Sequence, residues 1–364
     1  MSCKNTILKI KVSLLGLILF AAVTNAQNYK LVWFENFSGT SLDQNSWTYE
    51  SGGHGWGNNE LQYYTNRQEN SFIEDGKLII RANKESYSGK NYTSARLVTK
   101  GKKSFKYGKI EARIKLPFGQ GIWPAFWMLG NNIDLVSWPA CGETDIMEMI
   151  GGGSNDKTIY GTAHWSNNGT HASYGGRKTL VTSDIFADDF HIFGIEWTET
   201  YIKWLLDGNQ YHAIDITPSE LSELHNEMFI ILNVAVGGNW PGSPDATTQF
   251  PQQMEVDYIR VFQDMPTSVE TEDAGISDVN LTNFPNPFNN RTNIVFNSPV
   301  NSSYEADLMV TNIIGQVIKS EKLLIKPGSN QYSIELPDGS NSGIYFILLN
   351  NGSKSYSRKI VYVK

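Results

Sequence analysis

The chain has 364 residues, of which 30 are Lys or Arg and 37 are Asp or Glu, so its formal net charge is −7. A chain with this acidic balance has no electrostatic basis for binding nucleic acid or anionic lipid, and its length allows two or three domains. Its two cysteines form neither a CxxC redox pair nor a zinc-binding cluster with histidine.

Residues 1–26 are predicted to be a secretory signal peptide. Lys4, Lys9 and Lys11 accompany the apolar run VSLLGLILFAAV, and small residues near Ala26 suggest a cleavage site. The apolar run is short for a membrane span, and a lone membrane anchor is the alternative. Removal of this peptide leaves 338 of the 364 residues and, because it carries three lysines and no acids, changes the net charge from −7 to −10. Cys141 then remains alone, so we expect an exported protein without an internal disulfide.

Residues 27–264 are predicted to form one large β domain, since all ten tryptophans lie between Trp33 and Trp240. Strands are predicted where β-branched and aromatic residues alternate, as in KLIIRA (77–82), ARLVTK (95–100), YGKIEARIKL (107–116), KTIYGTAHW (157–165) and MEVDYIRVF (254–262). Asp207 and Gly208 predict a tight hairpin turn between two further strands. Only TPSELSELHNE (217–227) has the start of a helix. The pattern favours an all-β fold, a β-sandwich or jelly roll.

Three carboxylates are crowded into CGETDIMEMIGGG (141–153). In a helix, Glu143 would point away from Asp145 and Glu148, and in a regular strand Glu148 would lie on the face opposite the other two. A β-bulge, one extra residue at 146–147, returns Glu148 to the shared face and turns Met149 toward the interior. We therefore predict a bulged strand.

Like charges on one strand face repel one another and destabilise the strand, so their presence needs an explanation. Catalysis of glycoside hydrolysis is one. That reaction needs one carboxylic acid to protonate the leaving oxygen and one carboxylate on the other side of the sugar. Glu143 and Glu148 lie ~13 Å apart along the strand, a gap that their long arms can narrow, and Asp145 can separate their pKa values. The segment alone leaves two alternatives open: the solvated face of an ordinary strand, and a site for a hard cation such as calcium.

Aromatic and polar residues surround this segment in the sequence. Tryptophan occurs with glycine and amide residues in GWGNNELQYYT (55–65), GIWPAFWMLG (121–130) and VAVGGNWPG (234–242). Sugars pack their C–H faces on aromatic rings and exchange hydrogen bonds with polar side chains, so these segments are candidate walls of a cleft. Core packing is the alternative for each tryptophan, and a satisfied core histidine is the alternative for His164.

These residues carry a resemblance to a known family. Its motifs here are WPACGETDIMEMIG, GNNELQYYT, GIWPAFWML, GTAHW and ILNVAVGGNWPG, which together resemble glycoside hydrolase family 16, and within it the bacterial laminarinases, over roughly residues 29–263. The resemblance implies a concave jelly roll whose cleft binds β-glucan and cleaves it internally with retention. It implies Glu143 as nucleophile, Asp145 as its electrostatic helper and Glu148 as general acid/base. Substrate contacts are implied for Asn59, Arg96, Trp123, Trp127, His164 and Trp240.

The chain departs from the family pattern in two places. Thr144 and Met149 stand where relatives usually have isoleucine and tyrosine, and both should face away from the cleft. Many relatives hold a structural calcium, which the resemblance places at Gly76 and Asp257, although Asn36 replaces an acid that they usually carry nearby. We expect no cofactor for the chemistry itself and a possible structural calcium.

The chain beyond residue 264 is predicted to be a linker, 265–278, and a small C-terminal β-sandwich domain, 279–364. NFPNPFNNRTNIVF, VTNIIGQVIKS and GIYFILLNNGSKSYSRKIVYVK resemble the C-terminal sorting domain of type IX secretion substrates. An accessory carbohydrate-binding module is the alternative. The resemblance implies export to the cell surface or the medium by that machinery, with removal of this domain afterwards.

The sequence therefore predicts a secreted, endo-acting β-1,3-glucanase. Its expected partners are a laminarin-like β-1,3-glucan and the secretion machinery, with no nucleic acid and no membrane span, and we expect a monomer. A transglycosylase, a mixed-linkage glucanase and a non-catalytic glucan-binding protein are the alternatives that the sequence leaves open.

Overall fold

The computed structural model describes residues 29–37, 39–264, 281–298, 301–312, 317–350 and 355–364. The predicted signal peptide, 1–26, and the predicted linker, 265–278, lie outside the described residues. Within the described ranges, no helix is long and apolar enough to cross a membrane.

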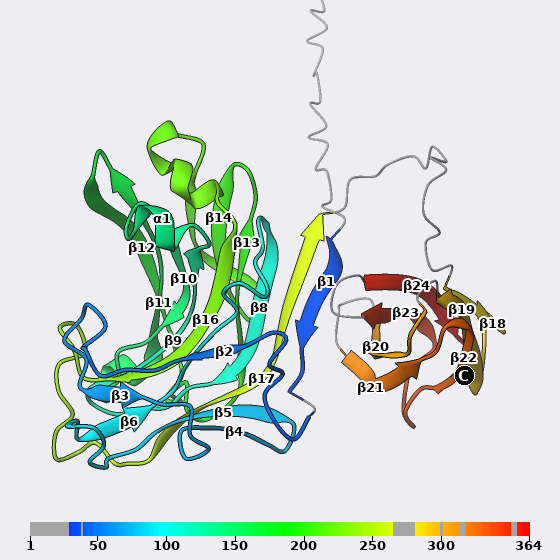
Figure 1. The fold of residues 1–364 in the computed structure, drawn as a ribbon, viewed down its shortest axis with the longest axis horizontal. Helices are drawn as coiled ribbons and strands as arrows, with labels where there is room; N and C mark the ends of the chain where they lie inside the picture. The colour runs from blue at the N-terminus through cyan, green and yellow to red at the C-terminus, as the bar shows by residue number, and fades with distance from the viewer. Residues whose placement is uncertain (1–28, 38, 265–280, 299–300, 313–316, 351–354) are drawn as a thin grey trace, which may run out of the picture.

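Two antiparallel sheets packed face to face form the larger body (Figure 1). The first has the strand order β15-β14-β13-β8-β17-β5-β4, and β1 pairs with the second half of the long strand β17. Its strands are β1 (Tyr29–Glu35), β4 (Ser71–Glu74), β5 (Lys77–Ala82), β8 (Gly108–Lys115), β13 (His191–Trp197), β14 (Tyr201–Leu206), β15 (Asn209–Asp215) and β17 (Gln252–Asp264).

The second sheet has the order β12-β11-β10-β9-β16-β7-β2 and carries the three acids on β10. Its strands are β2 (Thr48–Glu50), β7 (Arg96–Val98), β9 (Ile122–Gly130), β10 (Glu143–Glu148), β11 (Thr158–Asn167), β12 (Thr170–Thr179) and β16 (Met228–Val236). Short elements lie between these strands in the chain, namely the parallel pair β3 (Gln62–Tyr64) and β6 (Tyr92–Ser94), the helix α1 (Ile133–Val136) and the 3₁₀ helices η1 (Gly153–Lys157) and η2 (Ser219–His225).

Apolar side chains fill the space between the two sheets. On β9, Ile122, Phe126 and Met128 are fully buried in this core, while Trp123 and Trp127 lie on the other face of the strand and are only partly buried. This alternation assigns the inner face of the second sheet to packing and leaves its outer face for a cleft. Core packing, the alternative reading for tryptophan, holds for Trp47, Trp197 and Trp204, which are fully buried.

One predicted turn is confirmed, whereas the predicted helix is present only as a short 3₁₀ helix. Asp207 and Gly208 join β14 to β15 with φ values of 49° and 76°, the left-handed conformation that a two-residue hairpin turn requires. The predicted helix near residue 220 is the 3₁₀ helix η2, and the residue at its N-cap, Pro218, makes no side-chain cap. Leu221 and Leu224 are both buried and three residues apart, the spacing that one 3₁₀ turn brings to the same side.

The C-terminal unit is a separate, smaller sandwich. It combines a three-stranded sheet, β18-β19-β22, with a four-stranded sheet, β21-β20-β23-β24. The strands are β18 (Thr282–Phe284), β19 (Arg291–Ser298), β20 (Tyr304–Asn312), β21 (Val317–Ile325), β22 (Gly328–Glu335), β23 (Gly343–Asn350) and β24 (Ser355–Tyr362). A core of its own, including Ile294, Leu308 and Ile347, lies between these sheets.

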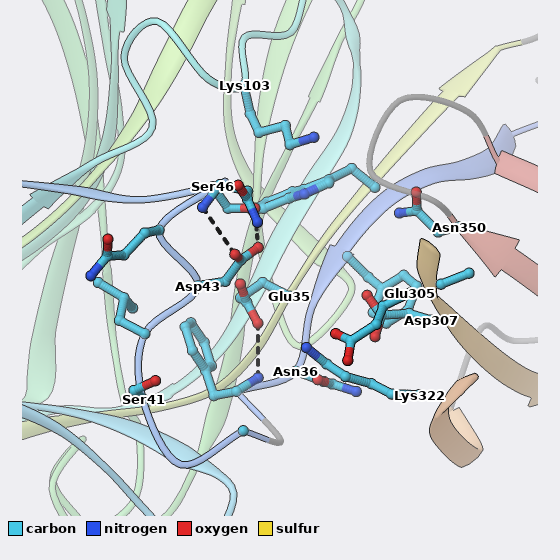
Figure 2. Close-up of a pocket in the computed structure, with 18 of the residues that line it drawn as sticks. Glu35, Asn36, Ser41, Asp43, Ser46, Lys103, Glu305, Asp307, Lys322 and Asn350 are labelled. Carbon is cyan, nitrogen blue, oxygen red and sulfur yellow. Dashed lines mark hydrogen bonds between the residues drawn. The ribbon is translucent and has the colours of Figure 1, made fainter. Parts of the chain in front are cut away.

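The two bodies meet at β1, an outer strand of the first sheet (Figure 1). Phe34 packs against Met309 and Leu348, and Asn36 Nδ2 donates to Ser320 Oγ at 2.6 Å. A cavity of about 800 Å³ lies beside this contact, lined from both bodies by polar side chains that include Glu35 and Asp307 (Figure 2). Since β1 belongs to the first sheet and the three acids belong to the second, this cavity is separate from them.

Candidate active site

The predicted β-bulge is present in β10 and places the three acids on one face. Against β11, the pairing register shifts between Asp145 and Glu148, and against β9 it shifts between Asp145 and Met147. Ile146, Met147 and Met149 are consequently all buried in the core between the sheets. Thr144, the first departure from the family pattern, is also buried and points away from the acids, as predicted.

An aromatic ring nitrogen contacts each of the three acids. Trp138 Nε1 donates to Glu143 Oε2 at 3.1 Å, and Trp123 Nε1 donates to Glu148 Oε1 at 2.9 Å. His164 Nε2 lies 2.9 Å from Asp145 Oδ2. These three contacts fix the carboxyl groups in space without supplying a full positive charge to the two glutamates.

The bulge is also anchored from the opposite sheet. The indole of Trp204, on β14, is fully buried and its Nε1 donates to the backbone carbonyl of Asp145 at 2.7 Å. A bulge removes ladder partners from the strand, so an external donor compensates the carbonyl that it frees. The core thereby holds the backbone from which the acids project.

Burial raises the pKa of all three acids. Burial, with the charge of Asp145 second, raises the pKa of Glu148 to about 8, while the hydrogen bond from Trp123 opposes the change. Burial raises the pKa of Asp145 to about 8, opposed by its hydrogen bond with Glu143. Burial and then Asp145 hold the pKa of Glu143 well above its usual range. The three groups therefore cannot all be ionised near neutral pH, and the cluster retains a proton for acid catalysis. The charges of His164 and Arg96 oppose the rise at Glu143 and favour its ionised form, whereas Arg96 does not act on Glu148.

Arg96 and Trp127, both predicted as substrate contacts, lie together on the outer face of the second sheet. The Arg96 guanidinium sits 4.9 Å from the ring centroid of Trp56 and 4.7 Å from that of Trp127. Its Nε donates to Glu50 at 2.6 Å, which keeps the planar group between the two rings. The sequence analysis did not single out Trp56 or Glu50, although Trp56 lies in the quoted segment 55–65.

The remaining predicted contacts gather beside Glu148. The ring of Trp240 is 42% exposed and stands edge-on to Trp123 at 5.6 Å and to Tyr160 at 4.9 Å. Asn59 Nδ2 donates to Asn239 Oδ1 at 2.9 Å, which joins the loops that carry Asn59 and Trp240. An exposed aromatic surface therefore continues along the sheet from the acid that is predicted to protonate the leaving group.

Two residues at the other end of the acids were missed by the sequence analysis. Trp138 is 46% exposed and contacts Glu143, as described above. His171, on β12, lies 2.9 Å from His164 through Nε2 and Nδ1, with its ring 4.6 Å from that of Trp138. Trp138 lies in the motif WPACGE and was available as a signal, whereas His171 follows only from the pairing of β11 with β12.

The hard-cation alternative for this segment finds little support in the geometry. Among the described residues, one group of three potential metal-binding side chains has its donor atoms within 4.8 Å of one another, namely Glu143, Asp145 and His164. Glu143 already accepts an N–H from Trp138, a donor that would repel a cation. The cluster is therefore better suited to exchanging protons than to binding calcium.

The donor set predicted for a structural calcium also fits that ion poorly. Asp257 Oδ2 accepts a hydrogen bond from Arg113 Nη1 at 2.8 Å, so its carboxylate is already paired with a cation. Gly76 lies in the turn between β4 and β5. A divalent ion at these residues would stand beside the Arg113 guanidinium, which disfavours it electrostatically.

The sequence matches two protein families along its length. Residues 58–260 match the model for glycosyl hydrolases family 16, and residues 282–364 match that of a secretion system C-terminal sorting domain. The chain belongs to family 16 of the glycosyl hydrolases. The second match confirms the predicted sorting domain, and with it export by type IX secretion to the cell surface or exterior. The predicted signal peptide and the removal of the sorting domain stay predictions.

Individual relatives agree with this assignment. The beta-glucanase of Rhodothermus marinus is 42% identical over 252 residues, covering 65% of this chain and 86% of the relative. The clotting factor G alpha subunit of Tachypleus tridentatus is 44% identical over 254 residues, and the match covers 68% of this chain but only 36% of that protein. The crystal structure of the laminarinase catalytic domain of Thermotoga maritima matches with 51% identity and a TM-score of 0.60, over 65% of this chain and 99% of that one. The predicted concave jelly-roll sandwich is confirmed by this similarity.

Proposed function

We propose that this family 16 hydrolase is an endo-acting β-1,3-glucanase that works with retention of anomeric configuration. The observation that carries the proposal is the bulge in β10, which brings Glu143, Asp145 and Glu148 to one face beside exposed aromatic rings. The similarity to laminarinases supports β-1,3-glucan as the substrate. Mature residues 27–264 would form the catalytic domain, 265–278 a linker and 279–364 the sorting domain, and the enzyme would act as a monomer.

In the first step of the proposed reaction, a carboxylate oxygen of Glu143 attacks the anomeric carbon. The bond from this carbon to the leaving oxygen breaks, and Glu148 transfers its proton to that oxygen. The raised pKa of Glu148, about 8, keeps the proton available at neutral pH. The product is a covalent glycosyl-enzyme and a shortened glucan.

In the second step, water replaces Glu143 at the anomeric carbon. Glu148, now a carboxylate, accepts a proton from the water while the water oxygen bonds to the carbon and Glu143 leaves as a carboxylate. Asp145 contributes through its hydrogen bond with Glu143 and through its charge, which helps to raise the pKa of both glutamates. The chemistry requires no cofactor.

Cleavage inside the glucan chain follows from where the aromatic residues lie. Trp138 is placed beside Glu143, and Trp123 with Trp240 beside Glu148, so exposed rings flank the acids on both sides. A polysaccharide lying across the acids can stack on both groups at once. Asn59 and Arg96 are the proposed polar contacts, with Trp127 and His164 completing the walls.

Three other functions are alternatives to this one. Two of them use the same catalytic acids, and the third involves no catalysis. A transglycosylase performs the same first step and then admits a sugar in place of water, and a mixed-linkage glucanase accepts β-1,4 bonds as well. A non-catalytic glucan-binding protein would gain nothing from Glu148, whose burial beside Asp145 is costly. The geometry therefore favours catalysis over binding alone, and the similarity to laminarinases favours hydrolysis over transglycosylation.

The proposal is tested by product analysis on laminarin, mixed-linkage glucan and agarose, with Glu143→Gln as the inactive control. Short β-1,3 oligosaccharides from laminarin, released first as the β-anomer and absent with the variant, are the expected result. Products longer than the substrate would indicate transglycosylation. Glucan binding without cleavage by the wild-type protein would refute the proposal.

A further inference from the structure

The proposed nucleophile is contacted by aromatic ring nitrogens on both of its oxygens. Trp138 Nε1 donates to Glu143 Oε2 at 3.1 Å, and His164 Nε2 lies 3.8 Å from Glu143 Oε1. His164 at the same time lies 2.9 Å from Asp145. The orientation of the Glu143 carboxyl plane therefore depends on where these two rings are held.

Both rings rest on a third, His171. In the β11–β12 hairpin, Ser173 is directly opposite His164, so His171 is its diagonal neighbour on the same face. The imidazole of His171 lies 5.1 Å from that of His164, nearly parallel to it, and 4.6 Å from the ring of Trp138. Its Nε2 is 2.9 Å from His164 Nδ1. One side chain thus contacts both groups that border Glu143.

The hydrogen bond between the histidines also selects a tautomer. His171 is exposed, but loss of part of its hydration and the neighbouring His164 lower its pKa, so it is neutral at neutral pH and has one N–H and one bare nitrogen. When His164 donates its Nε2–H to Asp145, its Nδ1 is bare and needs a donor. His171 Nε2–H is in place to be that donor. A histidine whose second nitrogen is fixed in this way is held in one tautomer and one ring orientation.

We propose that His171 is a positioning residue that holds His164 and Trp138 in the arrangement that orients Glu143 for attack. The inference rests on the proposed function, because it assigns to Glu143 the role of nucleophile. His171 itself touches neither the sugar nor the reacting atoms in this proposal. A position further along β12, such as Lys178, is exposed and serves as the matched control in the same strand.

Two substitutions separate the hydrogen bond from the stacking. His171→Phe keeps a flat ring beside Trp138 but has no nitrogen, whereas His171→Gln places an amide N–H near the position of Nε2. For His171→Phe we expect kcat on laminarin to fall about tenfold while KM changes less than about twofold. His171→Gln should recover most of this loss. Lys178→Ala should leave both constants unchanged.

An aryl β-laminaribioside with a good leaving group makes the test specific to the nucleophile, because its departure needs little help from Glu148. His171→Phe should lose as much activity on this substrate as on laminarin. Measured as kcat/KM, which reports the first step alone, Glu148→Gln should instead lose far less on the aryl glycoside than on laminarin. If His171→Phe lost activity only on laminarin, the substitution would be acting on protonation of the leaving group by Glu148, and the proposal would be overturned.

A readout without turnover completes the experiment. In the wild-type protein labelled with ¹⁵N-histidine, we expect the His164 signals of an Nε2–H tautomer, and in His171→Phe a mixture of tautomers. Wild-type kcat for His171→Phe, an unchanged tautomer, or equal loss in the Phe and Gln variants with a lowered unfolding temperature would each overturn the positioning role. If the wild-type protein cleaved no glucan, the proposed function would fail, and the tautomer measurement would still decide whether His171 controls His164.

Discussion

Replacing Glu148 by Gln should stabilise the larger body at alkaline pH while removing its activity. The folded protein raises the pKa of Glu148 from its ordinary value of 4.5 to about 8, so the folded state binds this proton more tightly than the unfolded state does. The stability linked to this group is fully present below pH 4.5 and is lost as the pH rises toward about 8. Gln is neutral throughout and can still accept the N–H of Trp123.

The shift in the pKa of Glu148 sets an upper limit on the gain in the free energy of unfolding. At about 1.4 kcal/mol for each pKa unit, the rise of the Glu148 pKa from 4.5 to about 8 corresponds to about 5 kcal/mol. Water that enters the open cleft when Glu148 ionises reduces this cost, so we expect the variant to be more stable by about 1–3 kcal/mol at pH 9. The difference in the free energy of unfolding between the wild type and Glu148→Gln should be smallest near pH 5.

Urea unfolding followed by tryptophan fluorescence measures this difference in one body only, because all ten tryptophans lie between Trp33 and Trp240. The midpoints of the wild type, Glu148→Gln and the control Glu220→Gln are compared at pH 5, 7 and 9. Glu220 is exposed in η2, so its substitution should leave the midpoint within error at every pH. A Glu148→Gln difference that did not grow with pH would refute the electrostatic reasoning.

Four further outcomes are expected. The value of kcat/KM should fall as the pH rises through about 8, because Glu148 must be protonated to act as the acid, and a pH–rate profile measures this limb. Asp145→Asn should move that limb to lower pH, because the charge of Asp145 helps to raise the Glu148 pKa. Trp204→Phe should lower the free energy of unfolding by about 1–3 kcal/mol, measured in urea, because it leaves a buried carbonyl in the bulge without its donor. EDTA should leave the fluorescence midpoint unchanged, because Arg113 already pairs with Asp257, and a lower midpoint would restore the calcium prediction.

The fold could be predicted from local pattern wherever one face of a strand is buried. KLIIRA was expected as a strand and is β5, and Asp207 with Gly208 was expected as a turn and joins β14 to β15. The bulge could be predicted because the spacing of Glu143, Asp145 and Glu148 is incompatible with a regular strand if all three act together. In each case the information lies within a few consecutive residues.

The rest of the site depends on contacts between distant segments, and local pattern does not report them. Trp204 reaches the bulge from a strand of the other sheet, 59 residues further along the chain. His171 approaches His164 because of the register of a hairpin whose sequence, THASYGGRKT, has no apolar alternation to set that register in advance. The helix near Leu221 was read from a cap that forms no hydrogen bond in the structure, where burial of two leucines decides the 3₁₀ turn.

The two faces of β10 explain how a largely buried strand can carry three acids. The inner side of β10, with Ile146, Met147 and Met149, contributes to a continuous apolar core, whose burial stabilises the strand regardless of what its other face carries. The outer side carries groups that are destabilising when charged, since burial and mutual repulsion raise their pKa values. The bulge lets one short strand both pack in the core and present the acids on its outer face. Without it, Glu148 would enter the core and Met149 would face the cleft. Loss of stability at alkaline pH and the ability to donate a proton at neutral pH are therefore two consequences of the same placement.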